Sequence, residues 1–175
     1  MRLPRSIPTM RLPRRTLIIA AAVVLVDATS KVIVAHWLVP GQVVRVGPLL
    51  ELDLYYNHAG ASNALTGHPV LVSALSLLST AVLVIMAAQV RSRGVAVALG
   101  LLIGGGVGNL VDRLAGGPGP FRGGVIDWIR PFGSRGSMNL ADLAINLGVL
   151  TFVGLVLGGW ARRLPRPSRA PCSAP

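Results

Sequence analysis

Four long apolar runs constrain this chain more than any other feature. They cover residues 16–38, 69–90, 95–110 and 140–160. About 20 apolar residues in a helix are enough to cross the ~30 Å hydrocarbon core of a bilayer. Only 13% of the residues are charged and 52% are hydrophobic, a composition typical of integral membrane proteins. The sequence therefore predicts an all-α membrane protein with four transmembrane helices.

The N-terminus has an alternative interpretation as a cleaved signal peptide, because five arginines precede the first apolar run. That run continues to Trp37, past the positions where a signal peptide would be cut, so we interpret it as a span. We expect one membrane domain over 16–160. A basic segment at 1–15 and a disordered basic tail at 161–175 flank it.

The arginines are distributed unequally between the two sides of the membrane. With four spans both termini share a side, which carries eleven arginines and no acidic residue, whereas the opposite side carries five arginines. The eleven are Arg2, Arg5, Arg11, Arg14, Arg15, Arg91, Arg93, Arg162, Arg163, Arg166 and Arg169. By the positive-inside rule both termini are cytoplasmic, and the remaining loops face the outside.

The segment between the first two spans is too polar to cross the membrane. Residues 50–56 alternate, with Leu50, Leu52, Leu54 and Tyr56 on one side, which is the period of a half-buried strand. We expect a small extracytoplasmic sheet, or β-cradle, on the membrane surface. The loop at 57–63 that follows is either a simple turn or a place where backbone groups approach an extended ligand.

Asp27 and Lys31 lie within the first apolar run, four residues apart. This spacing puts both side chains on one helical face, where an ion pair lowers the cost of burying either charge in the membrane. A structural ion pair is the favoured interpretation, with a direct catalytic role as the alternative.

The stretch 104–142 holds Asp112, Asp127 and Asp142, each beside an apolar segment. An ionisable group in a membrane span costs about 2.5–3.5 kcal/mol at mid-bilayer unless it is paired, hydrated or used in chemistry. All three fall on the outer side in the four-span topology. We therefore expect the functional site here.

Two further polar groupings belong to this stretch. Asn109, Asp112 and Arg113 have the i, i+3, i+4 spacing of residues on one helical face. Asn139 precedes the last apolar run and is a candidate N-cap. Between them, residues 125–129 form a short β-prone run in a Gly/Pro-rich loop.

The chemistry favoured by these residues is that of a carboxylate pair. His58 and His68 have no matched serine motif, Cys172 lies on the opposite side, and the metal-binding HExxH motif is absent. Two neighbouring aspartates cannot both ionise, so one holds a proton while the other is a base that activates water. This chemistry needs neither a metal nor another cofactor.

Which two aspartates form the pair is left open by composition. Asp112 is followed by Arg113, which would keep it ionised, whereas Asp127 and Asp142 have no cation within two residues. A proton-sharing pair is better built from Asp127 and Asp142.

Five motifs, in order along the four spans, resemble those of the lipoprotein signal peptidases (signal peptidase II), a family of bacterial intramembrane aspartic proteases. The family's motifs are D-x-x-x-K, N-x-G-A-A-F, G-N-x-x-D-R, V-x-D-F-I and F-N-x-A-D. The matching positions are Asp27 and Lys31; Asn57; Gly108, Asn109, Asp112 and Arg113; Val125 to Ile129; and Asn139, Ala141 and Asp142.

The resemblance implies cleavage of signal peptides from diacylglyceryl-modified prolipoproteins, just before the lipidated cysteine, at the outer face of the cytoplasmic membrane. It implies a catalytic dyad of Asp127 and Asp142 and sensitivity to globomycin. Separately, we expect the protein to be a monomer. Substrate-binding positions correspond to Asn57, Asn109, Arg113 and Asn139. Structural or positioning roles correspond to Asp27, Lys31 and Asp112.

Ala59, Ser62 and Met138 are among the residues that depart from the family's motifs. Without a gap, Ala59 replaces a glycine and Ser62 a phenylalanine, and Met138 replaces the phenylalanine before Asn139. These changes concern substrate and inhibitor preference more than the dyad.

Two other functions fit parts of the sequence. A presenilin-type or prepilin-peptidase-type protease would have a G-x-G-D motif, but here Asn109 follows Gly108. A small transporter or lipid-binding scaffold would use Asp27 and Lys31 as part of an ion path, which requires ionisable groups in several spans.

Overall fold

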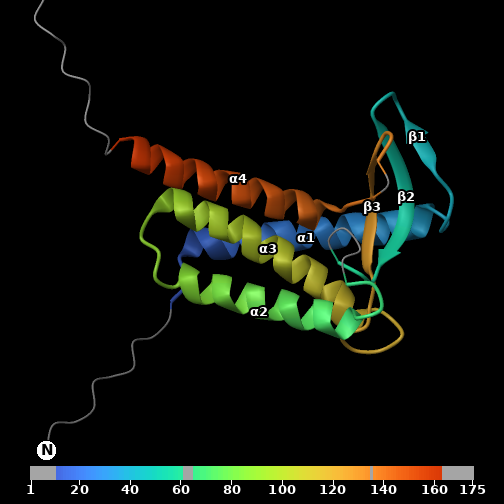
Figure 1. Cartoon of the computed structure of the whole chain (residues 1–175), viewed down its shortest axis with the longest axis horizontal. Coiled ribbons are helices and arrows are strands. Elements are labelled where there is room, and N and C mark those ends of the chain that lie inside the picture. Colours follow the sequence, from blue (N-terminus) through green and yellow to red (C-terminus); the bar gives the residue numbers. More distant parts are fainter. Residues whose placement is uncertain (1–10, 61–64, 135, 163–175) are drawn as a thin grey trace, which may run out of the picture.

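The computed structural model describes residues 11–60, 65–134 and 136–162, and shows four long helices with a small sheet at one end (Figure 1). Most of the two basic terminal segments, Cys172 and the departure at Ser62 lie outside the described residues. The helices are α1 (Arg14–Trp37), α2 (Pro69–Ala87), α3 (Arg93–Ala115) and α4 (Leu140–Ala161).

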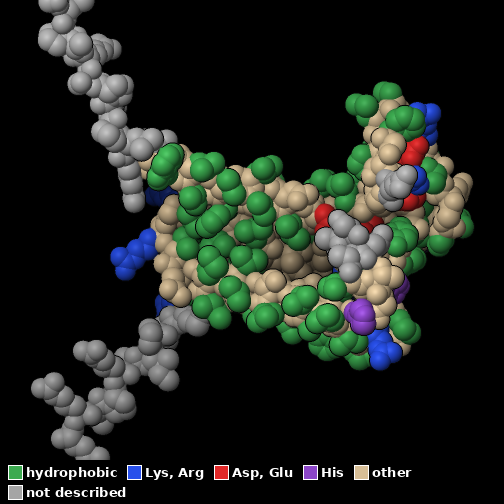
Figure 2. Space-filling view, in the orientation of Figure 1, with side chains coloured by type: hydrophobic (Ala, Val, Ile, Leu, Met, Phe, Trp, Pro, Cys, Tyr) green, Lys and Arg blue, Asp and Glu red, His purple; other side chains and the backbone are tan. Residues whose placement is uncertain are grey.

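All four helices are long and apolar enough to cross a membrane, and their outer surfaces carry large exposed apolar side chains (Figure 2). Such surfaces are favourable in lipid and unfavourable in water. The predicted four-helix membrane architecture is confirmed, and the chain is a multi-pass membrane protein.

Helix α3 is the centre of the bundle and packs against each of the other three helices. Its glycines make this close packing possible. A Cβ on Gly104 would lie 2.9 Å from the backbone oxygen of Ala20 in α1, and one on Gly105 would lie 2.5 Å from that of Ala141 in α4. Small residues therefore bring three backbones together, as is common in membrane helices.

Helix α3 continues to Ala115, beyond the expected end near Leu110. The additional residues are compatible with a helix, and the first helix-breaking sequence after Leu110 is the pair Gly116 and Gly117. The extension carries Asp112 and Arg113 on a regular helix, so their positions follow directly from α3.

The sheet has three antiparallel strands in the order β1 (Val44–Val46), β2 (Leu50–Asn57) and β3 (Val125–Pro131). Strands between the first two helices are therefore confirmed. The β-prone run before α4 pairs with β2, so the sheet joins both polar segments at this end of the bundle.

The alternation expected in β2 is broken by a register shift between Leu52 and Tyr55. Leu54 is buried, but Tyr56, expected on the same side, is exposed. A bulge of this kind re-aims the side chains that follow it. Beyond it, Tyr55 lies opposite Asp127, and Asn57 opposite Val125.

The two ends of the bundle differ in charge. The described chain begins and ends at the end away from the sheet (Figure 1). All six acidic residues lie in the sheet or in the helix segments nearest to it, since the membrane-buried Asp27 contacts the first turn of α4. The polar chemistry of the protein is therefore concentrated at one end.

Candidate active site

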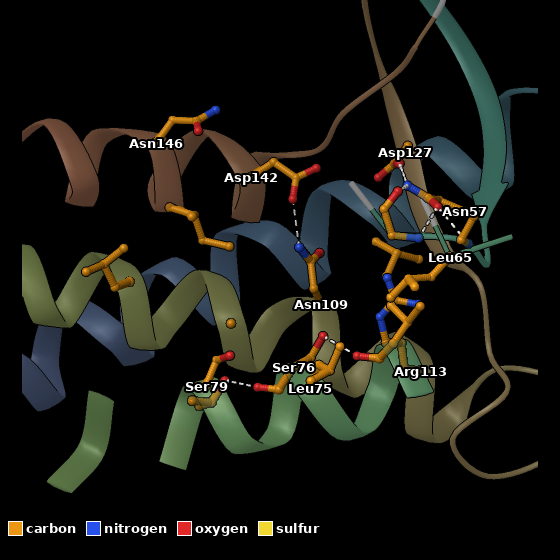
Figure 3. Close-up of a pocket in the computed structure, with 18 of the residues that line it drawn as sticks. Asn57, Leu65, Leu75, Ser76, Ser79, Asn109, Arg113, Asp127, Asp142 and Asn146 are labelled. Atoms are coloured by element: carbon orange, nitrogen blue, oxygen red, sulfur yellow. Dashed lines mark hydrogen bonds between the residues drawn. The ribbon is translucent and has the colours of Figure 1, made fainter. Parts of the chain in front are cut away.

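A cavity of about 720 Å³ lies where the sheet meets the ends of α2, α3 and α4. Asp127 comes from β3 and Asp142 from the first turn of α4, and both line this cavity (Figure 3). Asn57, Asn109 and Arg113 line it as well. Four separate segments thus contribute polar groups to one space.

Asp127 is buried, with 1% of its surface exposed. Its carboxylate accepts hydrogen bonds from Asn139 Nδ2 at 2.6 Å and from Asn57 Nδ2 at 3.0 Å. Burial raises the pKa of Asp127 to about 7, and the charge of Asp142 adds to this effect while the two amide donors oppose it. Asp127 is therefore poised to hold or release a proton near neutral pH.

Asn139 links the two aspartates and is completely buried behind them. Its Oδ1 accepts from the backbone N–H of Asp142 at 2.9 Å, and the Asp142 carboxylate accepts from the Asn139 N–H at 3.3 Å. This reciprocal capping box confirms the predicted N-cap. The other end of the same amide donates to Asp127, so one side chain fixes both carboxyl groups.

Asn57 holds Asp127 from the other side. Its Oδ1 accepts from the N–H groups of Ala59 and Gly60, at 3.1 and 3.0 Å. The amide nitrogen is consequently the end that faces Asp127. The loop therefore orients Asn57, and Asn57 orients the carboxyl group.

Asp142 is held by a relay that begins in α1. Asn109 Nδ2 donates to Asp142 Oδ1 at 2.8 Å, and Asn109 Oδ1 accepts from Lys31 Nζ at 3.2 Å. Because Lys31 binds the amide oxygen of Asn109, only the amide nitrogen of Asn109 is available to the Asp142 carboxylate. Lys31 thus fixes the orientation of the amide that contacts Asp142.

Lys31 also forms the main buried ion cluster. Its Nζ lies 2.6 Å from Asp27 Oδ2, as the i, i+4 spacing predicted, and 2.8 Å from Asp112 Oδ2. The other oxygen of Asp27 accepts from the N–H of Ala141 at 2.9 Å. A Cβ on Gly108 would lie 2.8 Å from Asp27 Oδ2, so glycine is needed for this contact. The cluster ties α1, α3 and α4 together beside the cavity.

Arg113 does not form an ion pair with Asp112, contrary to the expectation from their adjacency. Asp112 instead pairs with Lys31 and accepts from the N–H of Ile126 at 3.3 Å. Arg113 is 4% exposed, lines the cavity, and its Nε and Nη1 have no hydrogen-bond partner among the described residues. Unpaired buried donors of this kind are unfavourable until an acceptor arrives.

The remaining polar candidates lie beside the cavity rather than in it. His58 Nδ1 lies 3.0 Å from the backbone oxygen of Arg122, and Ser73 donates to that of Phe121 at 2.8 Å. Both contacts attach the loop before β3 to its surroundings. Of the motif departures, Ala59 lines the cavity, while the backbone of Met138 pairs with Ile129.

The sequence analysis missed the polar lining inside the helices. Ser76, Ser79 and Thr80 of α2 and Asn146 of α4 line the same cavity. Their signal was present as polar residues at helical spacing in otherwise apolar spans. Such residues in α2 were not singled out because the span carries no charge.

Comparison with known proteins agrees with this arrangement. The family model described as "Signal peptidase (SPase) II" matches residues 19–157. A lipoprotein signal peptidase of Mycobacterium avium is 35% identical over 161 residues, covering 90% of this chain and 86% of that protein. One of Mycolicibacterium smegmatis is 36% identical, covering 87% of this chain but 65% of that protein.

A solved structure of similar fold is titled a bacterial membrane enzyme structure obtained by the in meso method at 2.3 Å resolution. It has a TM-score of 0.75 and 25% identity, covering 86% of this chain and 92% of the other. A second structure with the same title at 1.9 Å resolution has a TM-score of 0.70, also at 25% identity, and covers 81% of this chain and 92% of the other. The chain belongs to the signal peptidase II family of aspartic proteases, the lipoprotein signal peptidases.

Proposed function

We propose that this protein removes the signal peptide from diacylglyceryl-modified prolipoproteins, with Asp127 and Asp142 as its catalytic dyad. The observation that carries the proposal is that both carboxyl groups line one cavity and are joined through the single side chain of Asn139. One of the two has a pKa of about 7. Aspartic proteolysis requires a pair of carboxyl groups that share one proton, and a raised pKa on Asp127 supports this role.

The reaction follows from these positions. Asp142 takes a proton from water as its oxygen attacks the carbonyl carbon, while Asp127 gives its proton to the carbonyl oxygen. The resulting tetrahedral diol collapses when the peptide nitrogen is protonated by Asp142 and the C–N bond breaks. One OH proton returns to Asp127 as the new carboxyl group forms, which restores the dyad.

The surrounding residues have separate tasks in this proposal. Asn57, Asn109 and Asn139 position the dyad through the hydrogen bonds described above. Arg113 brings unpaired donors to the cavity, where they suit a substrate carbonyl oxygen or a carbonyl of the cyclic peptide globomycin. Lys31 with Asp27 and Asp112 supports the helices.

The proposed setting is the bacterial cytoplasmic membrane, with both termini cytoplasmic and the sheet at the outer face. The positive-inside distribution of arginines supports this orientation. We propose a monomer in which 16–160 is the peptidase domain, and 1–15 and 161–175 are basic flanking segments. A transporter is not favoured, because the acidic residues of the spans gather at one end and leave no path of carboxylates across the membrane.

The test is cleavage of a diacylglyceryl-modified prolipoprotein by the purified protein in detergent. We expect product from the unaltered protein, its loss with globomycin, and a fall of about 10³-fold or more in Asp127→Asn and in Asp142→Asn. Glu51→Gln is the matched control, because this carboxylate lies on the same sheet but pairs with Arg130. Wild-type rates in either dyad variant would overturn the assignment.

A further inference from the structure

The cavity extends from the dyad along the groove between α2 and α4, which is visible as a hollow in the surface (Figure 2). Leu75 and Leu83 of α2 form one wall, and Ile145 of α4 belongs to the other. The floor is α3 at Gly106, where a Cβ would lie 2.6 Å from Thr80 Oγ1. The groove therefore continues from the polar end of the bundle toward the membrane interior.

Two polar side chains in this groove have no hydrogen-bond partner among the residues that the structure describes. Asn146 and Ser79 both line it, both are exposed, and neither makes a side-chain hydrogen bond within the described chain. Both residues belong to membrane-spanning helices, in which a polar group that no protein group, water or ligand satisfies costs several kcal/mol. Asn146 has more hydrogen-bonding capacity to satisfy than Ser79, because its amide group carries two N–H donors and a carbonyl acceptor.

The position of Asn146 indicates which part of a bound peptide could form hydrogen bonds with its side chain. Asn146 follows Asp142 by four residues, which is one helical turn, or about 6 Å further from the sheet. Figure 3 shows the two side chains on the same helix, with Asn146 on the turn beyond Asp142. An extended peptide advances about 3.3 Å per residue, so about two residues separate the level of the dyad from that of Asn146.

The conformation of the bound peptide follows from its backbone. A helical segment satisfies its own N–H and C=O groups and offers none to a side-chain amide, whereas an extended segment in lipid leaves them unpaired. Asn146 on α4 and Ser79 on α2 supply the missing partners on the two sides of the groove. The unpaired backbone groups of an extended peptide and the unpaired side chains of Asn146 and Ser79 can therefore hydrogen-bond one another.

We propose that Asn146 is a substrate-binding residue that hydrogen-bonds the backbone of the signal peptide about two residues before the cleaved bond, and so holds the peptide extended within the groove. The inference rests on the proposed function, since it identifies the groove's occupant as the signal peptide. It adds a binding subsite inside the membrane, away from the dyad.

The test compares two substrates and three proteins. One prolipoprotein substrate has only amide bonds, and the other has an ester in place of the second peptide bond before the cleaved one, which removes the N–H donor and weakens the carbonyl acceptor. The proteins are the unaltered chain, Asn146→Leu, and the control Leu147→Ala. Leu147 is 55% exposed on the same helix and does not line the cavity.

On the all-amide substrate we expect Asn146→Leu to lower kcat/KM about fivefold to tenfold, the effect of one lost hydrogen bond. We expect the ester to lower kcat/KM of the unaltered protein similarly, and Asn146→Leu to cause no further loss on the ester. Leu147→Ala should match the unaltered protein on both substrates, and the pH profile should not change in any variant.

Equal kcat/KM for Asn146→Leu and the unaltered protein would overturn the inference. So would an equal loss from Asn146→Leu on both substrates, which would indicate a role in water access or packing instead. These outcomes are distinct from failure of the proposed function, in which the unaltered protein would cleave neither substrate.

Discussion

Asn139 donates a hydrogen bond of 2.6 Å to Asp127, and the same side chain is the N-cap of helix α4. The residue that starts the helix is thus also the residue that sets the distance and orientation between the two carboxyl groups. The N-cap of α4 and the contact with Asp127 therefore depend on the same side chain, and a change at Asn139 tests both.

Asn139→Ser separates these two tasks. Serine caps a helix about as well as asparagine, but its hydroxyl has no amide nitrogen to donate to Asp127. We expect the free energy of unfolding to fall by about 1–3 kcal/mol, because the buried Asp127 loses a hydrogen-bond donor, while kcat/KM falls at least about tenfold. Asn139→Ala, which also loses the cap, should cost about 1 kcal/mol more. Full activity in Asn139→Ser would show that the contact with Asp127 is dispensable.

The pKa of Asp127 predicts a pH dependence. Because this carboxyl group must be protonated to act as the acid, kcat/KM should fall as pH rises through about 7. Asn57 donates to the carboxylate and lowers its pKa, so Asn57→Ala should move the descending limb to higher pH. A pH–rate profile of both proteins measures the shift, and an unmoved limb would contradict the assignment of the proton to Asp127.

The same group links pH to stability. In the unfolded chain the Asp127 carboxyl has its ordinary pKa of 3.8, and in the folded chain about 7, so the folded state binds more protons between these values. The contribution of Asp127 to the free energy of unfolding is complete below about pH 4 and is lost as pH rises to about 7. Detergent-based unfolding at several pH values should show a smaller decrease in Asp127→Asn, since this variant does not titrate.

Lys31→Met should be strongly destabilising. The substitution leaves the buried Asp27 and the partly buried Asp112 without their cation, and breaking a buried pair such as Lys31–Asp27 costs about 3–5 kcal/mol. Combining it with Asp27→Asn and Asp112→Asn should recover much of the loss. Thermal unfolding in one detergent compares the unaltered chain, Lys31→Met and the combined variant, and equal stability of Lys31→Met and the unaltered chain would show that the cluster is not structural.

Gly105→Ala tests the contact between α3 and α4. The added methyl group would lie 2.5 Å from the backbone oxygen of Ala141, the residue before Asp142. We expect a loss of about 1–3 kcal/mol together with reduced cleavage, because α4 has to move. Gly154→Ala is the control, since a Cβ there meets nothing within 4 Å. Equal behaviour of the two variants would contradict the tight packing at Gly105.

Much of the fold could be predicted because each span is defined by its own residues. The apolar runs placed all four helices, and alternation in the segment after Pro40 placed a strand at 50–57. The end of α3 and the broken alternation at Tyr56 could not be predicted as well. The broken alternation depends on pairing with β3, which lies about 70 residues beyond β2 in the chain. The end of α3 was placed too early because apolar content alone set the end of that span, whereas the helix continues to Ala115.

The sequence could predict which residues belong to the candidate site, but it could not predict which of them contact one another. The motifs identified Asp127, Asp142 and their neighbours, but Lys31 meets Asn109 across 78 residues of sequence, and Asn57 meets Asp127 across 70. No local pattern records such pairings. Adjacency was misleading for Asp112 and Arg113, because side chains three or four residues apart share a helical face whereas consecutive ones diverge.

The groove between α2 and α4 has a consequence for how the rate should be measured. A reactant that enters sideways from the lipid reaches the enzyme by two-dimensional diffusion, so encounters depend on the number of molecules per unit area of bilayer or micelle. Adding detergent at fixed protein and reactant concentrations should therefore slow turnover, because the reactant is diluted over a larger micelle surface. KM should stay constant when it is expressed as the mole fraction of reactant in the detergent, and should change when it is expressed as molarity.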